Sequence, residues 1–160
     1  MWTDLRIEIE KIKAELLIPE TAFRALKLNE WQGLEEKIYQ QFCHLNHPTA
    51  RPTWMWTRFK LDTAWLPYAE HYPAEYLSKL VEADEHVWIL LNETVNEHGK
   101  FWFYEGLIGA AQQIIAESSY IDEVLVVSKK LKWLLCITHH DDLGATGEKM
   151  PDKLRQLNIR

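Results

Sequence analysis

The sequence lacks the short motifs that identify many enzymes. It contains no Walker loop, no Gly-x-Gly-x-x-Gly, no Gly-x-Ser-x-Gly, no His-Glu-x-x-His and no His-x-His. Ser118, Ser119 and Ser128 therefore lie outside any context that would activate a serine nucleophile. We predict no catalytic residue and no cofactor from these motifs.

The sequence is also short of basic residues. It has 18 Lys and Arg against 24 Asp and Glu, which gives a net charge of -6, and no run is rich in Lys or Arg. An acidic chain favours solubility and is repelled by phosphate backbones. The sequence therefore argues against nucleic acid as a partner.

Cysteine is scarce, and no long apolar run occurs. Cys43 and Cys136 are far apart, do not form a Cys-x-x-Cys pair, and are flanked by large apolar residues. Buried free thiols in a reducing compartment are expected, although spacing alone leaves a disulfide open. We find neither a signal-peptide core nor the roughly 20 apolar residues that cross a bilayer. A cytoplasmic protein without a membrane partner is therefore predicted.

The first part of the chain has helical periodicity. Apolar residues recur at helical spacing over residues 2–17 and 30–45, and residues 20–28 form a shorter helix candidate. Residues 47–53 contain two prolines and no periodicity, so they are expected to connect two parts of the chain. We expect one domain over residues 1–160, with a helical part at 1–46 and a sheet-forming part at 54–147.

The second part has strand-like segments around one amphipathic helix. The helix is expected at residues 107–118, and a shorter one follows Pro73. Residues 62–73 are expected to be a loop, and residues 96–99 a hairpin loop. The expected strands are residues 54–61, 86–92, 100–105, 124–128 and 131–138. This order predicts an α+β fold, in which N-terminal helices precede a mainly antiparallel sheet of about five strands with helices on one face.

Specific side chains are expected in the core of this sheet. The helix at 107–118 should pack Leu107, Ile108, Ala111, Ile114 and Ile115 on it. On the strands, the expected core residues are Trp88, Leu90, Leu125, Val127, Trp133 and Leu135.

Four polar residues follow the last expected strand. His139, His140, Asp141 and Asp142 carry side chains that bind metals or move protons. Adjacent residues on a strand point to opposite faces, so both histidines cannot bind one metal while the strand continues. The alternative is structural, in which the histidines finish the strand and the aspartates begin a turn.

Aromatic and acidic residues mark candidate binding surfaces. Trp54, Trp56 and Trp65 lie close to loop prolines, and Glu93 and Glu97 lie at the rim of the expected hairpin. Binding residues concentrate on loops held by a rigid scaffold. We therefore expect a binding surface that includes residues 62–73 and 92–99, with His139 to Asp142 as further candidates.

Three segments carry a family resemblance. Residues 88–93 (WILLNE), 100–106 (KFWFYEG) and 127–147 (VSKKLKWLLCITHHDDLGATG) resemble a family of small bacterial proteins of unknown function, over about the last 75 residues. That resemblance implies no functional residue. The acidic chain and the segment from Pro73 to Leu80 are also similar to the SUKH superfamily, many of whose members look like immunity proteins of toxin systems. This second likeness implies a protein that binds a toxin and has no chemistry of its own.

Two functions follow as hypotheses. The first is a protein-binding module, of which an immunity-like toxin inhibitor is one form, because acidic charge and abundant Trp and Tyr suit a protein interface. The second is a metal-dependent enzyme that uses His139 to Asp142. The metal content of the purified protein distinguishes them.

Overall fold

The fold is an α+β arrangement around one antiparallel sheet, as a computed structural model of the 160-residue chain shows. The structure describes residues 3–67, 70–93 and 100–157. The predicted fold class is therefore confirmed, but the sheet has seven strands instead of about five, in the order β1-β4-β3-β5-β6-β7-β2. The strands are β1 (Phe23–Ala25), β2 (Thr63–Trp65), β3 (His86–Glu93), β4 (Phe101–Leu107), β5 (Ile121–Ser128), β6 (Trp133–Ile137) and β7 (Leu143–Gly147).

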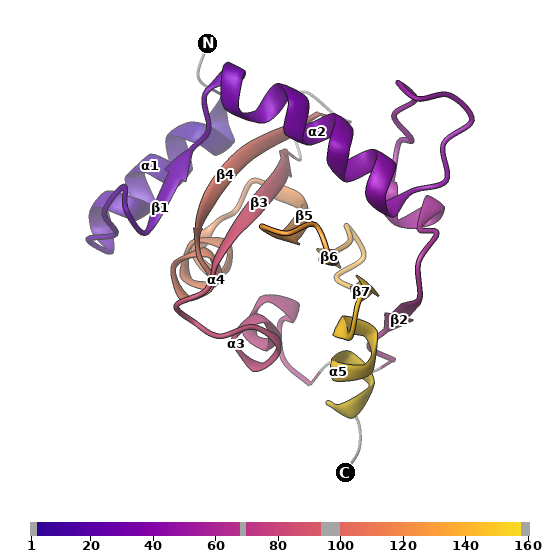
Figure 1. Cartoon of the computed structure of the whole chain (residues 1–160). Coiled ribbons are helices and arrows are strands. Elements are labelled where there is room, and N and C mark those ends of the chain that lie inside the picture. Colours follow the sequence, from indigo (N-terminus) through magenta and orange to yellow (C-terminus); the bar gives the residue numbers. More distant parts are fainter. Residues whose placement is uncertain (1–2, 68–69, 94–99, 158–160) are drawn as a thin grey trace.

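Helices cover both faces of this sheet, whereas the sequence predicted one covered face (Figure 1). On one face lie α1 (Asp4–Glu15), α3 (Leu77–Leu80), α4 (Ile108–Glu117) and α5 (Met150–Gln156). On the other lie α2 (Leu28–Phe42) and the 3-10 turn η1 (Met55–Arg58). A second 3-10 turn, η2 (Pro73–Tyr76), leads into α3.

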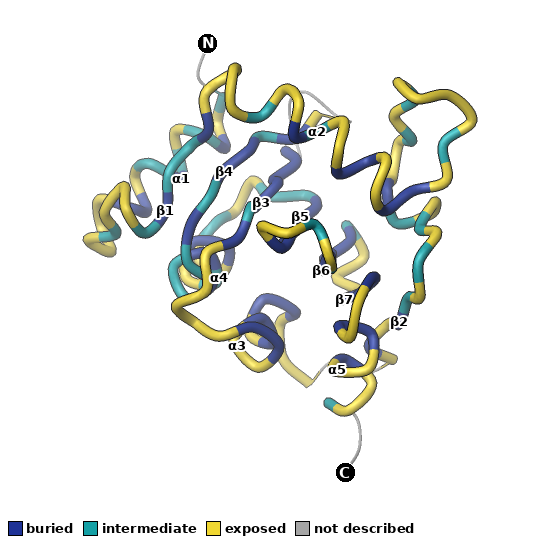
Figure 2. The backbone as a smooth tube through the Cα atoms, in the orientation of Figure 1, coloured by how far each residue is buried: buried dark blue, intermediate teal, exposed yellow. Residues whose placement is uncertain are grey.

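The strands alternate their side chains between the two layers. Along β3, Ile89 and Leu91 pack under α4, whereas Leu90 faces α2. Along β4, Trp102 and Tyr104 point to the first layer and Phe101 and Phe103 to the second. Because both faces are covered, the central strands consist almost entirely of large apolar residues. Most of β3 is buried (Figure 2).

Helix positions follow from the apolar spacing that the sequence shows. In α1 the buried Leu5, Ile9 and Ile12 recur on one face. In α4 the buried residues are Ile108, Ala111, Ile114 and Ile115, as expected, whereas Leu107 is half-buried and precedes the helix.

Several local predictions are wrong. Residues 54–61 are not a strand, because Thr57 donates its N–H and its hydroxyl to the Trp54 carbonyl (3.2 and 2.7 Å) and closes η1. Residues 20–28 are not a helix, because Phe23–Ala25 pairs with β4 as an edge strand. The expected loop 62–73 contains β2, and the expected tail contains β7 and α5.

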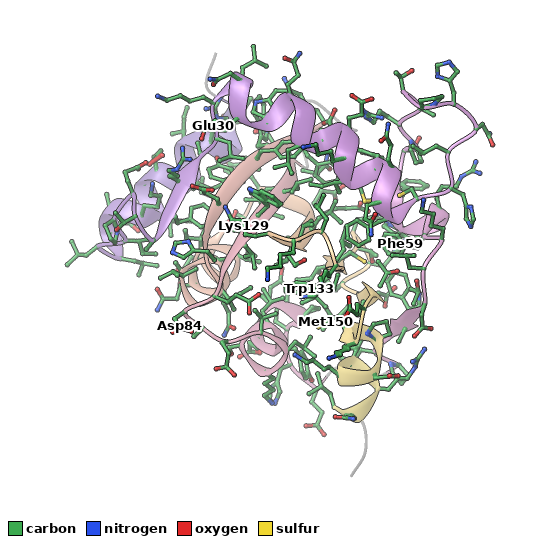
Figure 3. The ribbon with its side chains drawn as sticks, viewed as in Figure 1. Glu30, Phe59, Asp84, Lys129, Trp133 and Met150 are labelled. Carbon is green, nitrogen blue, oxygen red and sulfur yellow. The ribbon has the colours of Figure 1, made fainter. Side chains whose placement is uncertain are left out.

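Among the expected core residues, Leu90, Leu125, Val127 and Leu135 are buried. Trp88 and Trp133 are only half-buried at the margins of the two layers. Trp133 and Met150 of α5 line one surface pocket (Figure 3). Both cysteines are free and buried, and both lie in the layer under α2. Within residues 3–67, 70–93 and 100–157, no helix is long and apolar enough to span a membrane.

Candidate functional site

Five of the predicted binding residues gather in one aromatic cluster. Trp54, Trp56, Trp65, His139 and His140 come from three segments that are separate in the sequence, and we refer to them as the aromatic cluster. Ring centroids lie 6.1 Å apart for Trp54–Trp56, 6.0 Å for Trp56–Trp65, 5.1 Å for Trp54–His139 and 4.0 Å for His139–His140. These separations are within or just below the usual range for aromatic contacts.

Local backbone structure sets the positions of the tryptophans. The turn η1 places Met55 in the core and turns Trp54 and Trp56 toward His139. Trp65 lies on β2 opposite Gly144 of β7, and a Cβ built on Gly144 would lie 2.6 Å from its ring. The glycine therefore leaves the space into which the Trp65 ring packs.

A buried carboxylate fixes the orientation of the cluster. Glu123 on β5 has a 5% exposed side chain, and its Oε2 accepts hydrogen bonds from Trp56 Nε1 (3.1 Å) and His139 Nδ1 (2.6 Å). The His139 backbone N–H also points to Oε2, at 3.4 Å. A carboxylate oxygen accepts hydrogen bonds, so this contact suits the His139 tautomer that carries a proton on Nδ1. Glu123 thus holds one tryptophan and one histidine in place.

A β-bulge brings a second carboxylate to the same place. The register between β3 and β5 shifts at Asn92 and Glu93, so Asp122 is the additional residue opposite them. Regular alternation would send Asp122 and Glu123 to opposite faces, but the bulge lets both line one pocket. Bulges of this kind commonly re-aim side chains at functional sites.

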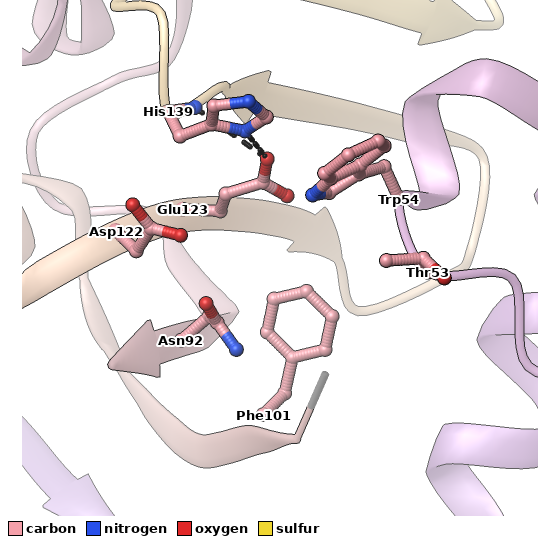
Figure 4. Close-up of a pocket in the computed structure, with 7 residues that line it drawn as sticks. All are labelled: Thr53, Trp54, Asn92, Phe101, Asp122, Glu123 and His139. Atoms are coloured by element: carbon pink, nitrogen blue, oxygen red, sulfur yellow. Dashed lines mark hydrogen bonds and ion pairs between the residues drawn. The ribbon is translucent and has the colours of Figure 1, made fainter. Parts of the chain in front are cut away.

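The pocket has a volume of about 270 Å³ and lies beside the aromatic cluster (Figure 4). Its wall combines rings with hydrogen-bond acceptors. The lining residues are Thr53, Trp54, Asn92, Phe101, Asp122, Glu123 and His139. The site is therefore a small concave surface with a few polar groups, as ligand sites commonly are.

The His-His-Asp-Asp segment forms the turn between β6 and β7. Thr138 donates its N–H to the Asp142 carbonyl (2.9 Å), and its hydroxyl accepts from His140 N (3.2 Å) and Asp142 N (3.3 Å). Asp141 has a positive φ of 61°. Burial of the Tyr72 hydroxyl raises the pKa of Tyr72, and the negative charge of Asp141 raises it further. No group of three or more His, Cys, Asp or Glu in the described part of the chain is placed to hold a metal ion.

The acidic candidates lie elsewhere. Glu93 is 1% exposed and points to the opposite face, where its Oε1 accepts the Leu5 N–H at the start of α1 (3.2 Å). Its buried position excludes it from a contact surface, and its Oε2 has no partner among the described residues. Glu97, with most of the expected hairpin rim, lies outside the described residues.

Sequence reasoning missed four pocket residues, Thr53, Phe101, Asp122 and Glu123, whereas Asn92 lies within the expected surface at residues 92–99. One signal was available, since Asp122 and Glu123 directly precede an apolar run that forms a central strand. A carboxylate within such a strand is rarely buried without a partner. The bulge that brings both side chains into the pocket has no comparable signature in the sequence.

The chain belongs to a family of unknown function, DUF6756, whose model matches residues 1–158. The family likeness therefore extends over nearly the whole chain and not only over the last 75 residues. No curated protein and no solved structure matches.

Proposed function

We propose that the protein acts by binding another protein, through the surface formed by the aromatic cluster and the adjoining pocket. One observation carries the proposal. Trp54 and Trp65 are 43% and 39% exposed, and both rings contact Trp56. The buried Glu123 holds Trp56 in place through a hydrogen bond.

Exposed tryptophan side chains keep a large apolar area in contact with water, which is unfavourable unless a partner covers that area. Large apolar side chains that gather on a surface commonly mark an interaction site. Trp is also enriched among the residues that contribute most to binding energy. Because Glu123 already restrains Trp56 and His139, little side-chain freedom is left to lose on association.

The net charge suggests the kind of partner. A chain with a charge of -6 attracts basic proteins over a distance, and such attraction accelerates association. An immunity-like inhibitor of a basic toxin is the narrower form of this proposal. Co-expression with a candidate toxin tests that form, and protection of growth is the expected result.

The test of the general proposal compares matched aromatic substitutions. Wild type, Trp54→Ala, Trp65→Ala and Tyr120→Ala are each used to capture proteins from the native host. Tyr120 is 38% exposed and lies outside the cluster, so it is the control. One protein should be captured by wild type and Tyr120→Ala but lost with both tryptophan variants. Equal capture by all four proteins would contradict the proposal.

A metal-dependent enzyme remains the second candidate, and one observation favours it. The Glu123 carboxylate on His139 Nδ1 leaves Nε2 available, which is the arrangement that orients histidine ligands of metals. Metal analysis of the purified protein tests this function. One zinc or manganese per chain, lost in His139→Ala, together with measurable turnover, would replace the binding proposal.

A further inference from the structure

Three side chains that line the pocket beside the aromatic cluster, Asn92, Asp122 and Glu123, carry hydrogen-bond acceptor oxygens. We propose that this pocket receives the cationic end of a lysine or arginine side chain from the partner protein. This inference rests on the proposed function and deepens it, because it assigns the chemistry that the partner must present.

Asn92 supplies the first acceptor. It is 6% exposed, and its Nδ2 donates to the Lys100 carbonyl at 2.9 Å. Among the described residues no hydrogen bond reaches its Oδ1, although Asn92 lines the pocket. An amide oxygen without a donor in the protein can accept a hydrogen bond from a ligand.

The carboxylates supply the remaining acceptors. The hydrogen bonds that described residues make to Glu123 all end on Oε2, so Oε1 is left without a donor. Asp122 is half-buried at the bulge and accepts no hydrogen bond from the described residues. Asn92 Oδ1, Glu123 Oε1 and the Asp122 carboxylate can thus accept several N–H groups together.

The aromatic walls suit the same ligand. In Figure 4, Asn92, Asp122 and Glu123 come from the sheet, and Trp54 belongs to the segment that faces them. Phe101 completes the apolar part of the wall. Ring faces attract ammonium and guanidinium groups, and they also cover the alkyl stem of a long side chain.

Among the described residues, the pocket wall has almost no basic groups. Of its lining residues only His139 can carry a positive charge, and its Nδ1 is engaged by Glu123. A second surface pocket, beside β4, differs in that Arg6 and Lys27 line it together with Glu10 and Glu20. Of these two pockets, the one beside the cluster therefore has the charge that favours a cation.

The pocket is small enough to suit a single side chain. The volume of about 270 Å³ is below the range of roughly 300–1,000 Å³ that encloses drug-sized molecules. A single lysine or arginine end group leaves the rest of its protein outside, in contact with Trp54 and Trp65.

A titration with model compounds tests the inference without the partner. The protein is titrated with n-butylguanidinium, n-butylammonium and the neutral n-butylurea, while the indole N–H resonances of Trp54 and Trp56 are followed by NMR. Both cations should shift these resonances saturably, with dissociation constants on the order of 1–10 mM. n-Butylurea has the shape of the guanidinium compound without its charge and should bind at least about tenfold more weakly.

Three variants locate the site. Asp122→Asn should weaken cation binding about tenfold, because a charge-assisted hydrogen bond is lost. Glu123→Gln should do the same, and Asp122→Asn keeps the test valid if Glu123→Gln unfolds. Glu117→Gln removes a charge from the exposed end of α4 and should leave binding unchanged.

The outcomes separate this inference from the proposed function. Absence of a saturable shift, equal binding of n-butylurea, or unchanged binding by Asp122→Asn overturns the inference and leaves the partner surface intact. If the partner binds Asp122→Asn as tightly as wild type, the cationic side chain that the pocket receives does not come from that partner. Capture that survives both Trp54→Ala and Trp65→Ala overturns the proposed function, whatever the titration shows.

Discussion

Nδ1 of His139 lies 2.6 Å from Oε2 of the buried Glu123, and this contact joins the turn between β6 and β7 to the N-terminal part of β5. The same oxygen holds Trp56, which is more than 60 residues away in the sequence. One carboxylate thus ties the η1 segment and the turn to the sheet.

Removal of this carboxylate should lower stability. In Glu123→Ala, Trp56 Nε1 and His139 Nδ1 both lose their acceptor, and we expect a loss of about 1–3 kcal/mol in the free energy of unfolding. Denaturant unfolding measures it, and Glu117→Ala on the exposed end of α4 is the control. Equal midpoints for the two variants would show that Glu123 does not hold the cluster.

Two strand glycines should tolerate alanine differently. A Cβ at Gly106 would lie 2.3 Å from the Ala22 carbonyl oxygen, which belongs to the backbone beside β1. At Gly144 it would meet the Trp65 ring, which is partly exposed and can move. Gly106→Ala should therefore cost about 1–3 kcal/mol, in the range for overpacking. Gly144→Ala should cost less and should displace Trp65.

Thermal unfolding and an NMR spectrum of the indole groups check this pair of substitutions. The Trp65 resonance should shift in Gly144→Ala while the rest of the spectrum is preserved. A larger loss of stability in Gly144→Ala than in Gly106→Ala would contradict the packing described for Trp65.

Both thiols should be inert in the folded protein. Burial raises the pKa of Cys43 from 9.0 to about 12, and burial likewise raises the pKa of Cys136. Because the thiolate is the reactive form, neither should react with Ellman's reagent at pH 8 until the chain unfolds. Two thiols per chain should then appear in denaturant, and rapid reaction of either in buffer would contradict its burial.

An ion pair at the N-terminal end of α2 should contribute to stability only above acidic pH. Arg24 hydrogen-bonds both oxygens of Glu30 (2.6 and 3.0 Å) and lowers the pKa of Glu30 from 4.5 to about 2. A carboxylate whose pKa is lower in the folded state than in the unfolded state stabilises the fold. Its contribution is complete above the unfolded pKa of 4.5 and is lost as the pH falls toward 2.

The comparison of wild type with Glu30→Gln tests that dependence. Wild type should be the more stable at pH 7, and the difference in unfolding midpoint should shrink steadily between pH 5 and pH 2. A difference that stays constant over that interval would show that the Glu30 charge contributes nothing.

The central part of the fold could be predicted from the sequence, and its edges could not. The apolar runs that become β3, β5 and β6, and the helical spacing of α1, α2 and α4, indicate their own structure. The three-residue strands β1 and β2 depend on their neighbours instead. Phe23 stacks on Tyr104 at 5.0 Å, and Thr63 contacts Thr146 at 2.9 Å, so tertiary pairing overrides local preference.

The candidate site was predictable to a similar extent. The tryptophans and the histidine turn stand out by residue type, but nothing in their spacing shows that Trp65 packs against Trp56. Glu93 appeared as a rim residue because the sequence does not show which face of β3 is covered by α1. A charge reversal of Glu93 would therefore test stability instead of binding.

Hydrogen exchange measured on the complex tests the central claim most directly. Once a captured partner is available, backbone exchange is compared between the free and the bound protein. Binding should slow exchange in residues 53–58, 63–66 and 138–142, which carry the aromatic cluster and the rim of the pocket. Protection confined to α1, α4 and α5 on the opposite face of the sheet, with those three segments unchanged, would contradict the account.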